Sequence, residues 1–521
     1  MRTSNQSHFA FVPSADIQRS AFDRSHGLKT TFNGGYLIPV FCDEVLPGDT
    51  FNLSMSAFCR LATPIKPIMD NMYLDSFFFF VPNRLVWNNW ERFNGAQPTP
   101  GASTDFLIPV TSGSFAVNTL PDYFGLPINV ALSNVNALPF RAYNLIFNEW
   151  FRDENIVQPR PVPMGDGPDS ATTNQFVTPA RRGKRKDYFT SCLPWPQKGP
   201  AVSLPLGTSA PVFANITSSP WRAARLGGTT TPSTGNVQLD AGPALTDSTG
   251  NKIYLTPPVD GSLFADLSAA TAATINSLRQ AFQLQRLYER DARGGTRYIE
   301  ILKAHFGVTS PDFRLQRPEY LGGGSTPINI NPIAQTSAGN AQPTPQGNLA
   351  AMGHVSVRSN GFARSFVEHG YIIGLVSVRA DLTYQQGLNR MWSRRTRFDF
   401  YWPALAHLGE QAVLNKEIYY SATNNDGVFG YQERYAEYRY KPSQITSIFR
   451  SQAAGTLDVW HLAQNFTSAP VLNTTFIEEN PPIARVIAVP SEPEFLGDFY
   501  FRLRCVRPMP VYSVPGLIDH F

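Results

Sequence analysis

Charged residues are scarce in this chain of 521 amino acids. Asp, Glu, Lys and Arg together make up 16% of it, against about 25% in an ordinary globular protein. Such a low charge content excludes an acidic disordered chain and a charge-rich coiled coil. It also indicates that much of the surface is covered by other molecules.

Cysteine is scarce as well. The four cysteines, Cys42, Cys59, Cys192 and Cys505, are too few for a disulfide framework, and no two of them have the CxxC spacing of a zinc site. We therefore expect buried free thiols in a reducing compartment.

Long apolar runs and catalytic motifs are also lacking. The most apolar run, Phe77–Val81, is too short to span a bilayer, and the N-terminus has no hydrophobic signal core, so we expect no membrane insertion. None of the eight histidines stands in HExxH, and there is no GxSxG elbow and no P-loop. Gly322–Ser325 predicts a flexible loop, and Glu478-Glu479 predicts a turn. The sequence therefore predicts no enzyme, no catalytic site and no metal site.

Proline, glycine, aromatic residues and arginine are what the chain does contain. It has 43 prolines and 38 glycines, and 12% of it is aromatic. Because proline is poorly tolerated in helix interiors and central strands, this composition favours a β-rich protein with long ordered loops. Arginine outnumbers lysine by 35 to 9, and the guanidinium group suits protein interfaces and phosphate recognition.

Alternating apolar and polar residues predict strands near both ends of the chain. The clearest is Phe51–Leu61; the others are Tyr36–Cys42, Met72–Val81, Val355–Val357, Ile372–Leu382, Tyr431–Tyr440, Val486–Val489 and Phe499–Val506. Helices are predicted at Leu85–Phe93, Arg141–Arg152, Ser268–Arg293 and Arg297–Phe306. About eight strands without βαβ alternation or internal repeats favour a mainly β fold, an eight-stranded antiparallel jelly roll with long loop insertions and a few α-helices.

The same pattern predicts five segments. They are an N-terminal arm (1–32), a first group of strands with an irregular, partly helical insertion (33–200), a Thr/Ser/Gly-rich insertion with few charges (201–268), a helical and loop insertion (269–350), and the remaining strands with a C-terminal tail (351–521). The prolines would then lie largely in loops between strands.

Three groups of cations are candidate nucleic-acid contacts. The densest holds Arg181, Arg182, Lys184, Arg185 and Lys186, just before Tyr188 and Phe189; the others are Arg394, Arg395 and Arg397 beside Arg390 and Trp392, and the pair Arg502 and Arg504. Cations bind phosphates with release of counterions, and nearby aromatic rings can stack on bases. The alternatives are solvated loops, or pairing with acids of a neighbouring subunit.

Several long and unusual stretches occur together in this chain. They are Glu44–Thr50, Asp75–Arg84 followed by Trp87 and Trp90, Asp187–Gly199, Glu289–Tyr298 and Arg314–Gly323. With them, the chain resembles over nearly its full length the major capsid protein of microviruses, the small icosahedral single-stranded DNA phages, and specifically the gokushovirus branch. Residues 201–268 do not match in detail and coincide with a variable insertion of that branch.

This resemblance implies a viral jelly roll that assembles as sixty copies into a T=1 shell around circular single-stranded DNA. It also implies threefold protrusions built from the variable insertion, which would attach to a host-surface receptor. A minor DNA pilot protein would be a further partner, and the virion would assemble in the cytoplasm of a bacterial host. No cofactor is expected, and structural calcium stays open.

The net charge of the chain predicts one more partner. The chain carries +4, so sixty copies would carry roughly +240, whereas the coding region for this chain alone has about 1,560 phosphates; the shell would offset only about 15% of them. Polyamines, metal cations or a small basic internal protein must supply the rest. The resemblance likewise implies a small basic DNA-binding protein inside the shell.

Two other functions fit a jelly roll. A cellular carbohydrate-binding protein would use Trp221, in the variable segment, to stack on a sugar; in the capsid interpretation Trp221 is a candidate receptor contact. A cupin-type enzyme would need a histidine-rich metal set, but His354 and His369 have no acidic partner at cupin spacing. The long proline-rich insertion at 82–200 argues against a bare lectin.

Overall fold

The computed structural model describes residues 18–200, 202, 275–294, 304–305, 316–337 and 346–512, together with six short strands between 212 and 265. The chain divides into two compact units. The first combines Met1–Pro196 with Thr296–Phe521, and the second is Gln197–Gly295. Each is described by itself.

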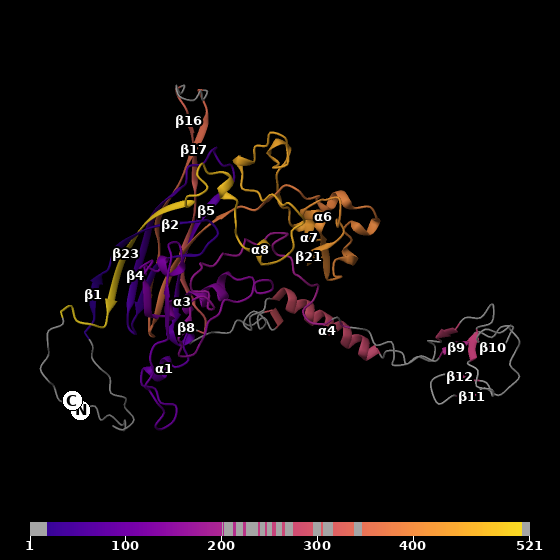
Figure 1. Cartoon of the computed structure of the whole chain (residues 1–521), viewed down its shortest axis with the longest axis horizontal. Helices are drawn as coiled ribbons and strands as arrows, with labels where there is room; N and C mark the ends of the chain where they lie inside the picture. Colours follow the sequence, from indigo (N-terminus) through magenta and orange to yellow (C-terminus); the bar gives the residue numbers. More distant parts are fainter. Residues whose placement is uncertain are drawn as a thin grey trace, which may run out of the picture. The chain divides into compact units, whose positions relative to one another are not determined.

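Two antiparallel sheets form the centre of the first unit (Figure 1). The six-stranded sheet contains β1 (Ser20–Asp23), β2 (His26–Phe32), β23 (Phe495–Arg507), β4 (Thr50–Leu61), β17 (Leu349–Ser365) and β16 (Asn329–Ala334). The four-stranded sheet has the order β15 (Glu319–Pro327), β5 (Met72–Pro82), β18 (Gly370–Ala380) and β3 (Ile38–Val45).

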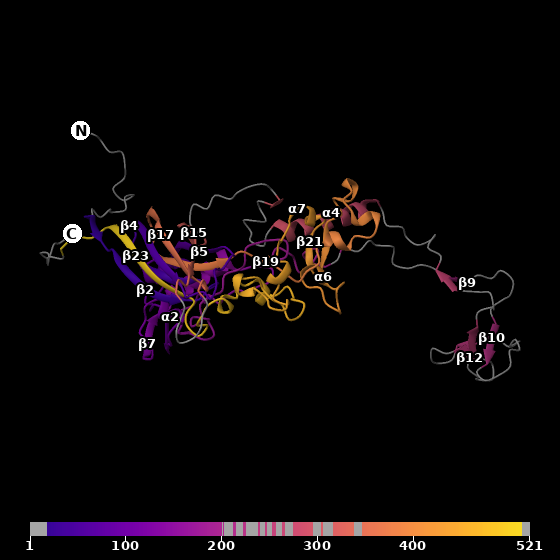
Figure 2. The same cartoon turned by 90° about the horizontal axis from the view of Figure 1, so that it is seen from above.

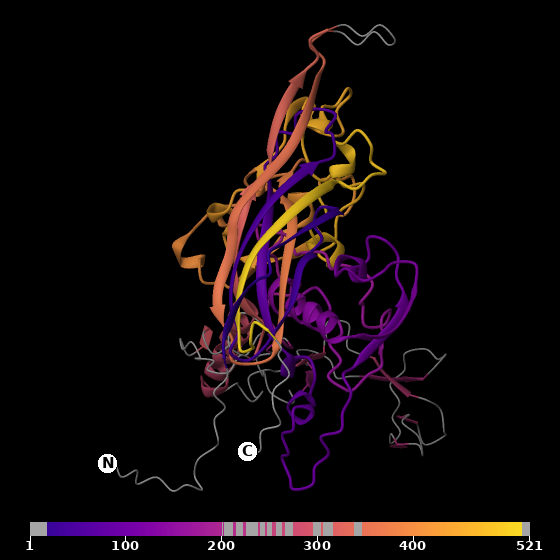
Figure 3. The ribbon, with the colours of Figure 1, turned by 90° about the vertical axis from the view of Figure 1, so that its left-hand side faces the viewer.

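The connections between the two sheets define a jelly roll. The order β2-β23-β4-β17 in one sheet and β3-β18-β5-β15 in the other means that the chain crosses from sheet to sheet at nearly every step. The first two strands both pair with the last: Phe22 of β1 lies opposite Cys505 of β23, and Leu28 of β2 lies opposite Phe499. This is the double-sheet topology of jelly rolls, and the predicted fold class is confirmed. Figure 3 shows the strands along one common axis, with β16 and β17 extending beyond the sandwich.

The space between the sheets is filled by alternate residues of their strands. In β4, Phe51, Leu53 and Met55 are buried while Asn52 and Ser56 are exposed, as the period of two predicts. Phe499 and Phe501 of β23 join them in the same core. Burial of these apolar side chains is the main favourable term that holds the sheets together.

A second core lies on the outer side of the four-stranded sheet. Phe79 and Val81 of β5 and Tyr371 and Ile373 of β18 point into it, away from the first core. Because both faces of β18 are covered, all eleven of its residues are buried. The covering layer comes from the insertions that follow β5 and β18.

The insertion after β5 consists of short elements. They are η2 (Asn83–Leu85), α1 (Trp90–Phe93), β6 (Val110–Ser114), α2 (Leu120–Tyr123), β7 (Ala131–Asn136), α3 (Leu138–Ile146), a π-helical turn at Phe147–Phe151, and β8 (Asp169–Ser170). Pro139 stands in the first turn of α3, where its missing N–H costs no hydrogen bond. Arg141 of α3 forms two hydrogen bonds of 2.7 and 2.8 Å with Asp169, and both side chains are buried. This pair ties α3 to β8 inside the covering layer.

The insertion between β18 and β23 is also largely irregular. It contains β19 (Thr383–Tyr384), β20 (Glu410–Leu414), α6 (Asn415–Ile418), β21 (Val428–Glu433), α7 (Ala436–Arg439), β22 (Ser443–Gln444), α8 (Thr474–Ile477) and six short 3-10 turns, at Arg390–Ser393, Arg397–Asp399, Pro403–Leu405, Ser447–Phe449, Asp458–Trp460 and Ile483–Arg485. Figure 2 shows α6, α7 and β21 at the opposite end of this unit from β4 and β23.

Where it is described, the second unit contains six short strands and one long helix. The strands are β9 (Val212–Ala214), β10 (Arg222–Arg225), β11 (Gln238–Leu239), β12 (Leu245–Thr246), β13 (Ile253–Thr256) and β14 (Leu263–Ala265), and they pair as β10–β13, β11–β12 and β9–β14. The helix α4 spans Ile275–Gly294, which agrees with the predicted helix Ser268–Arg293 from Ile275 onward; residues 268–274 of that prediction lie outside the described residues. The unit, Gln197–Gly295, contains the whole of the expected variable insertion at 201–268, and the bounds of that insertion stay a prediction.

Several local predictions need correction. Residues 20–32 of the expected arm form β1 and β2, because they complete the sheet beside β23. The Gly322–Ser325 loop is part of β15, where glycines fit because the backbone of β17 passes close by: a side chain on Gly322 would meet the carbonyl oxygen of Gly361 at 2.5 Å.

Two expected strands are also replaced. Tyr431–Tyr440 divides into β21 and α7, with Tyr435 in the left-handed conformation between them. Val486–Val489 contributes only an isolated bridge at Ile487. Among the cysteines, three are buried as expected, but Cys42 is exposed.

Candidate nucleic-acid interface

Arg502 and Arg504 lie on the outer face of the six-stranded sheet. In β23 they alternate with the buried Phe501, Leu503 and Cys505, so both guanidinium groups point to solvent. Within the described residues, neither has a hydrogen bond or an ion pair within 4.0 Å. These two predicted contacts are therefore placed where an external phosphate could reach them.

Two further arginines share this face and were not among the sequence candidates. Arg60 of β4 lies opposite Leu496 of β23, and Arg358 of β17 is exposed near the bulge where the β4–β17 register shifts. Their outward positions follow from the alternation in β4 and β17. That alternation was visible in the sequence, but the pairing that gathers the strands was not.

Arg181 and Arg182, in the densest cation run, are used inside the protein. Arg181 lies over the ring of Tyr36 at 4.1 Å and donates to the carbonyl oxygen of Glu479 at 3.0 Å. Arg182 forms an ion pair with Asp75, which also accepts from Arg379 at 2.9 Å. Burial opposes ionisation of Asp75, but hydrogen bonds from Ser325 and Arg182 outweigh it and lower the pKa of that carboxyl.

The prediction that Lys184 contacts nucleic acid is wrong, because its ammonium group is buried. It donates to the carbonyl oxygen of Phe476 at 2.5 Å and to Gln464 at 3.1 Å, and it lies over the Phe476 ring. Burial lowers the pKa of Lys184 to about 8, although Glu479 and Asp187 act in the opposite direction. An external phosphate cannot reach this group.

The last two cations of the run are more accessible. Lys186 pairs with Asp153, and Arg185 lies 3.8 Å from Asp381; both cation side chains remain more than half exposed. They border a cavity of about 400 Å³ lined by Phe77, Phe79 and Trp150. Contact of Arg185 and Lys186 with DNA stays a prediction.

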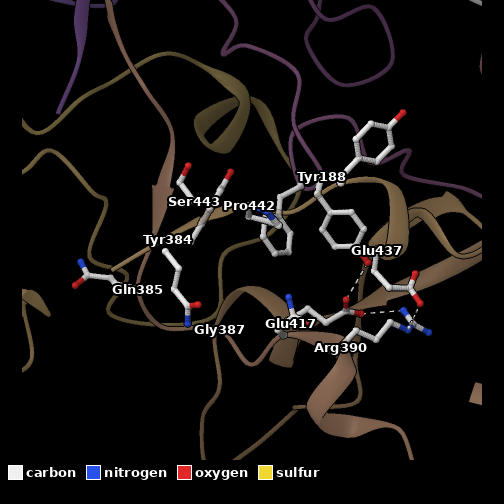
Figure 4. A pocket seen from close by; sticks show the side chains of 13 residues that line it. Tyr188, Tyr384, Gln385, Gly387, Arg390, Glu417, Glu437, Pro442 and Ser443 are labelled. Carbon is white, nitrogen blue, oxygen red and sulfur yellow. Dashed lines mark hydrogen bonds and ion pairs between the residues drawn. The ribbon is translucent and has the colours of Figure 1, made fainter. Parts of the chain in front are cut away.

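Arg394 belongs to a buried charge network through its ion pair with Glu437. Figure 4 shows Arg390, Glu417 and Glu437 of this network. Arg394 pairs with Glu437 at 3.0 Å, and Arg390 pairs with Glu417 at 2.9 Å. Tyr188 donates its hydroxyl hydrogen to Glu417 at 2.9 Å. Burial raises the pKa of Glu417, although the ion pair with Arg390 opposes this effect. The network lines a cavity of only about 50 Å³, so it serves to hold α6, α7 and the Tyr188 segment together.

Arg395 and Arg397 are exposed beside a cluster of aromatic side chains. Arg397 lies over the ring of Trp402 at 4.4 Å. Six large apolar or aromatic residues of this segment are at least 40% exposed: Met391, Trp392, Phe398, Phe400, Tyr401 and Trp402. We call these six residues the aromatic patch. Exposed apolar clusters of this kind mark contact surfaces.

The remaining predictions are more limited. Trp221 lies outside the described residues. Where the structure is described, no three His, Cys, Asp or Glu side chains gather as metal ligands, and calcium binding stays a prediction. No helix in that same part of the chain is long and apolar enough to cross a membrane.

The fold and these surfaces together define a class of protein. Jelly rolls form the shells of viruses and also occur in lectins and cupins; a jelly roll with large insertions over one sheet, an arginine-bearing face on the other and an exposed aromatic patch is compatible with a viral shell protein. The sequence profile of the family described as Capsid protein (F protein) matches residues 10–517.

Three relatives are each described as capsid protein VP1. The chain is 52% identical to that of Bdellovibrio phage phiMH2K, with 99% of each chain covered. It is 47% identical to that of Chlamydia phage 1, with 98% of each covered, and 36% identical to that of Spiroplasma virus 4, with 98% of this chain and 97% of the relative covered. The chain belongs to the Capsid protein (F protein) family of phages, which confirms the resemblance to gokushovirus capsid proteins. It is a structural component of a virion, and identical copies of it form the shell.

Proposed function

We propose that sixty copies of this chain form a T=1 icosahedral shell that encloses single-stranded DNA. The observation that carries self-association is the aromatic patch, in which Trp392 is 71% exposed and Phe398 is 64% exposed. A free chain would hold these rings in water at a cost, and contact with a neighbouring copy removes them from it. A shell built from one kind of chain supplies such a neighbour at every position.

The other partners follow from charge and from the family. With only +4 on each chain, the shell needs a small basic internal protein, polyamines or metal cations to balance the DNA. A minor DNA pilot protein would complete the particle. The variable insertion at 201–268, with Trp221, would form threefold protrusions that bind a host-surface receptor. Assembly would take place in the bacterial cytoplasm.

Electron microscopy of purified particles tests this function. The full-length chain is produced with its phage partners, any scaffolding protein included, and the particles are imaged and treated with nuclease. We expect shells with sixty copies that protect single-stranded DNA. Chains that stay monomeric with all partners present would contradict self-assembly, and shells that never protect DNA would contradict enclosure.

A further inference from the structure

The outer face of the six-stranded sheet presents cations and aromatic rings from neighbouring strands. Its members, which we call the arginine–aromatic face, are Lys29 of β2, Tyr500, Arg502 and Arg504 of β23, Phe58 and Arg60 of β4, and His354 and Arg358 of β17. In contrast to the four-stranded sheet, whose outer side is covered by the insertions, this face keeps its long side chains exposed.

Pairing across the sheet sets small neutral residues beside the long ones. Tyr500 lies opposite Ser56, Arg502 opposite Ser54 and Arg504 opposite Asn52. Strands are about 4.8 Å apart, and alternate residues of one strand are about 6.8 Å apart. Tyr500, Arg502 and Arg504 therefore each stand beside a short side chain of β4 that neither forms an ion pair with them nor covers them.

Positive charge predominates on this face. Two carboxylates share it: Asp498 is paired with Lys29 at 3.3 Å, and Asp23 lies opposite Arg504 and accepts from Ser25. In the described part of the chain, Arg60, Arg358, Arg502 and Arg504 have no acidic partner within 4.0 Å. Four unpaired guanidinium groups on one sheet face match a ligand that carries negative charge at regular intervals.

The aromatic residues on this face are not needed for packing. Phe58 is 53% exposed and Tyr500 is 54% exposed, while the core beneath them is filled by Phe499 and Phe501. Phe58 lies against the ring of His354, with 6.1 Å between centroids. Aromatic rings set among arginines form the usual binding platform of single-stranded nucleic acids, because every base has a face that can stack.

A second copy of the chain fits this surface less well than DNA does. Contact between two such faces would bring arginines together, and contact with another surface would require that surface to supply acids at the same spacing. A phosphate backbone supplies negative charge along its whole length.

We propose that the arginine–aromatic face binds the packaged single-stranded DNA, with Arg60, Arg358, Arg502 and Arg504 on phosphates and Phe58 and Tyr500 stacked on bases. This inference rests on the proposed enclosure of DNA and names the surface that performs it. The binding is independent of base sequence, because rings and guanidinium groups contact parts that all nucleotides share.

Binding of a fluorescent thymidine 20-mer to the purified full-length chain, measured by anisotropy between 50 and 300 mM NaCl, tests the proposal. R502Q/R504Q is expected to weaken binding and to reduce the salt slope by about 0.7 for each lost phosphate contact. F58A/Y500A is expected to weaken binding about 5-fold to 150-fold for each base that loses its stack, at an unchanged slope. The matched control R439Q/K441Q removes two exposed cations elsewhere and should bind like the parent chain; thermal unfolding checks that each variant is folded.

Each other outcome overturns the proposal. Face variants that bind like the parent chain, or a control that weakens binding equally, would place the DNA elsewhere. Face variants that keep DNA binding but stop assembly would make this face a contact between copies. A parent chain that binds no oligonucleotide at any salt concentration would also refute the inference, while nuclease-protected DNA in intact particles would leave the proposed function standing.

Discussion

The two outer faces of the sandwich differ in whether other parts of the chain cover them. The outer face of the four-stranded sheet, with Phe79, Val81 and Ile373, is covered by α3 and its neighbours and is buried. The outer face of the six-stranded sheet, with Phe58, Tyr500 and Arg502, is uncovered within the described chain. The part of the chain that the structure describes thus covers one sheet and leaves the other open to a partner. An aromatic residue consequently has a structural role on the first face and a binding role on the second.

The largest effect is predicted for the free energy of unfolding when two phenylalanines, one on each face, are replaced in turn. Phe79→Ala is expected to lower the free energy of unfolding by about 3–5 kcal/mol, because it leaves a cavity against Trp150, Phe151 and Tyr320. Phe58→Ala should change it by less than about 1 kcal/mol. Urea unfolding of the full-length chain measures both. Equal losses would show that the uncovered face is packed within the chain after all.

The same comparison can be made for charged residues, with the buried Arg141 of the covering layer and the exposed Arg502 of the six-stranded sheet. Arg141→Ala leaves Asp169 buried without its partner and is expected to cost about 3–5 kcal/mol. Arg502→Ala should stay within about 0.5 kcal/mol of the parent chain, because its side chain is exposed. Replacement of both partners by R141L/D169L should recover part of the loss. If it does not, the hydrogen bonds of Arg141 to Val86 and Gly165, rather than the unpaired charge, account for the cost.

Lys184 predicts a pH effect that the exposed arginines lack. The pKa of Lys184 is about 8 in the folded chain and about 10.4 when unfolded, so the unfolded state binds its proton more tightly. As the pH falls from about 10.4 towards 8, Lys184 is protonated in the unfolded chain before it is protonated in the folded chain. The free energy of unfolding that this group contributes above about pH 10.4 is therefore lost over this range. The loss is about 3 kcal/mol at most. The unfolding free energy of Lys184→Met, measured between pH 7.5 and 9.5, should rise less steeply than that of the parent chain; parallel curves would contradict the burial.

The smallest effect on stability is predicted for the aromatic patch. Trp392→Ser should change the unfolding free energy by less than about 0.5 kcal/mol, because Trp392 is largely exposed. In the assembly reaction, however, the assembled fraction seen by sedimentation should fall. Val367→Ser, which also replaces an exposed apolar residue, serves as the control. If Trp392→Ser assembles normally, the aromatic patch is not a contact between copies.

Strand prediction succeeded where one face of a strand is buried and the other is polar. β4 and β23 have this alternation, and the structure places both in the sheet as expected. It missed β2 and β15, since their partners lie far along the chain and their own residues have little apolar pattern. Partner strands decide the conformation of such segments.

The candidate site was predicted in its chemistry but not in its location. Arginine-rich segments were recognised, yet Lys184 and Arg394, which have the same local pattern as exposed cations, are held by Phe476 and Glu437. These partners are far away in sequence, so no local signal distinguishes a cation used inside the protein from one available to DNA. Arg60 and Arg358 were overlooked for the converse reason, because each stands alone in its own segment.

The sequence by itself determined the fold class, the family and the arginine-rich, aromatic composition, because strand alternation and long family motifs are local properties that can be recognised along the chain. Only the tertiary structure decided which face of each sheet is covered and which arginines remain unpaired. Both depend on contacts between residues hundreds of positions apart, such as β2 with β23 and Lys184 with Phe476.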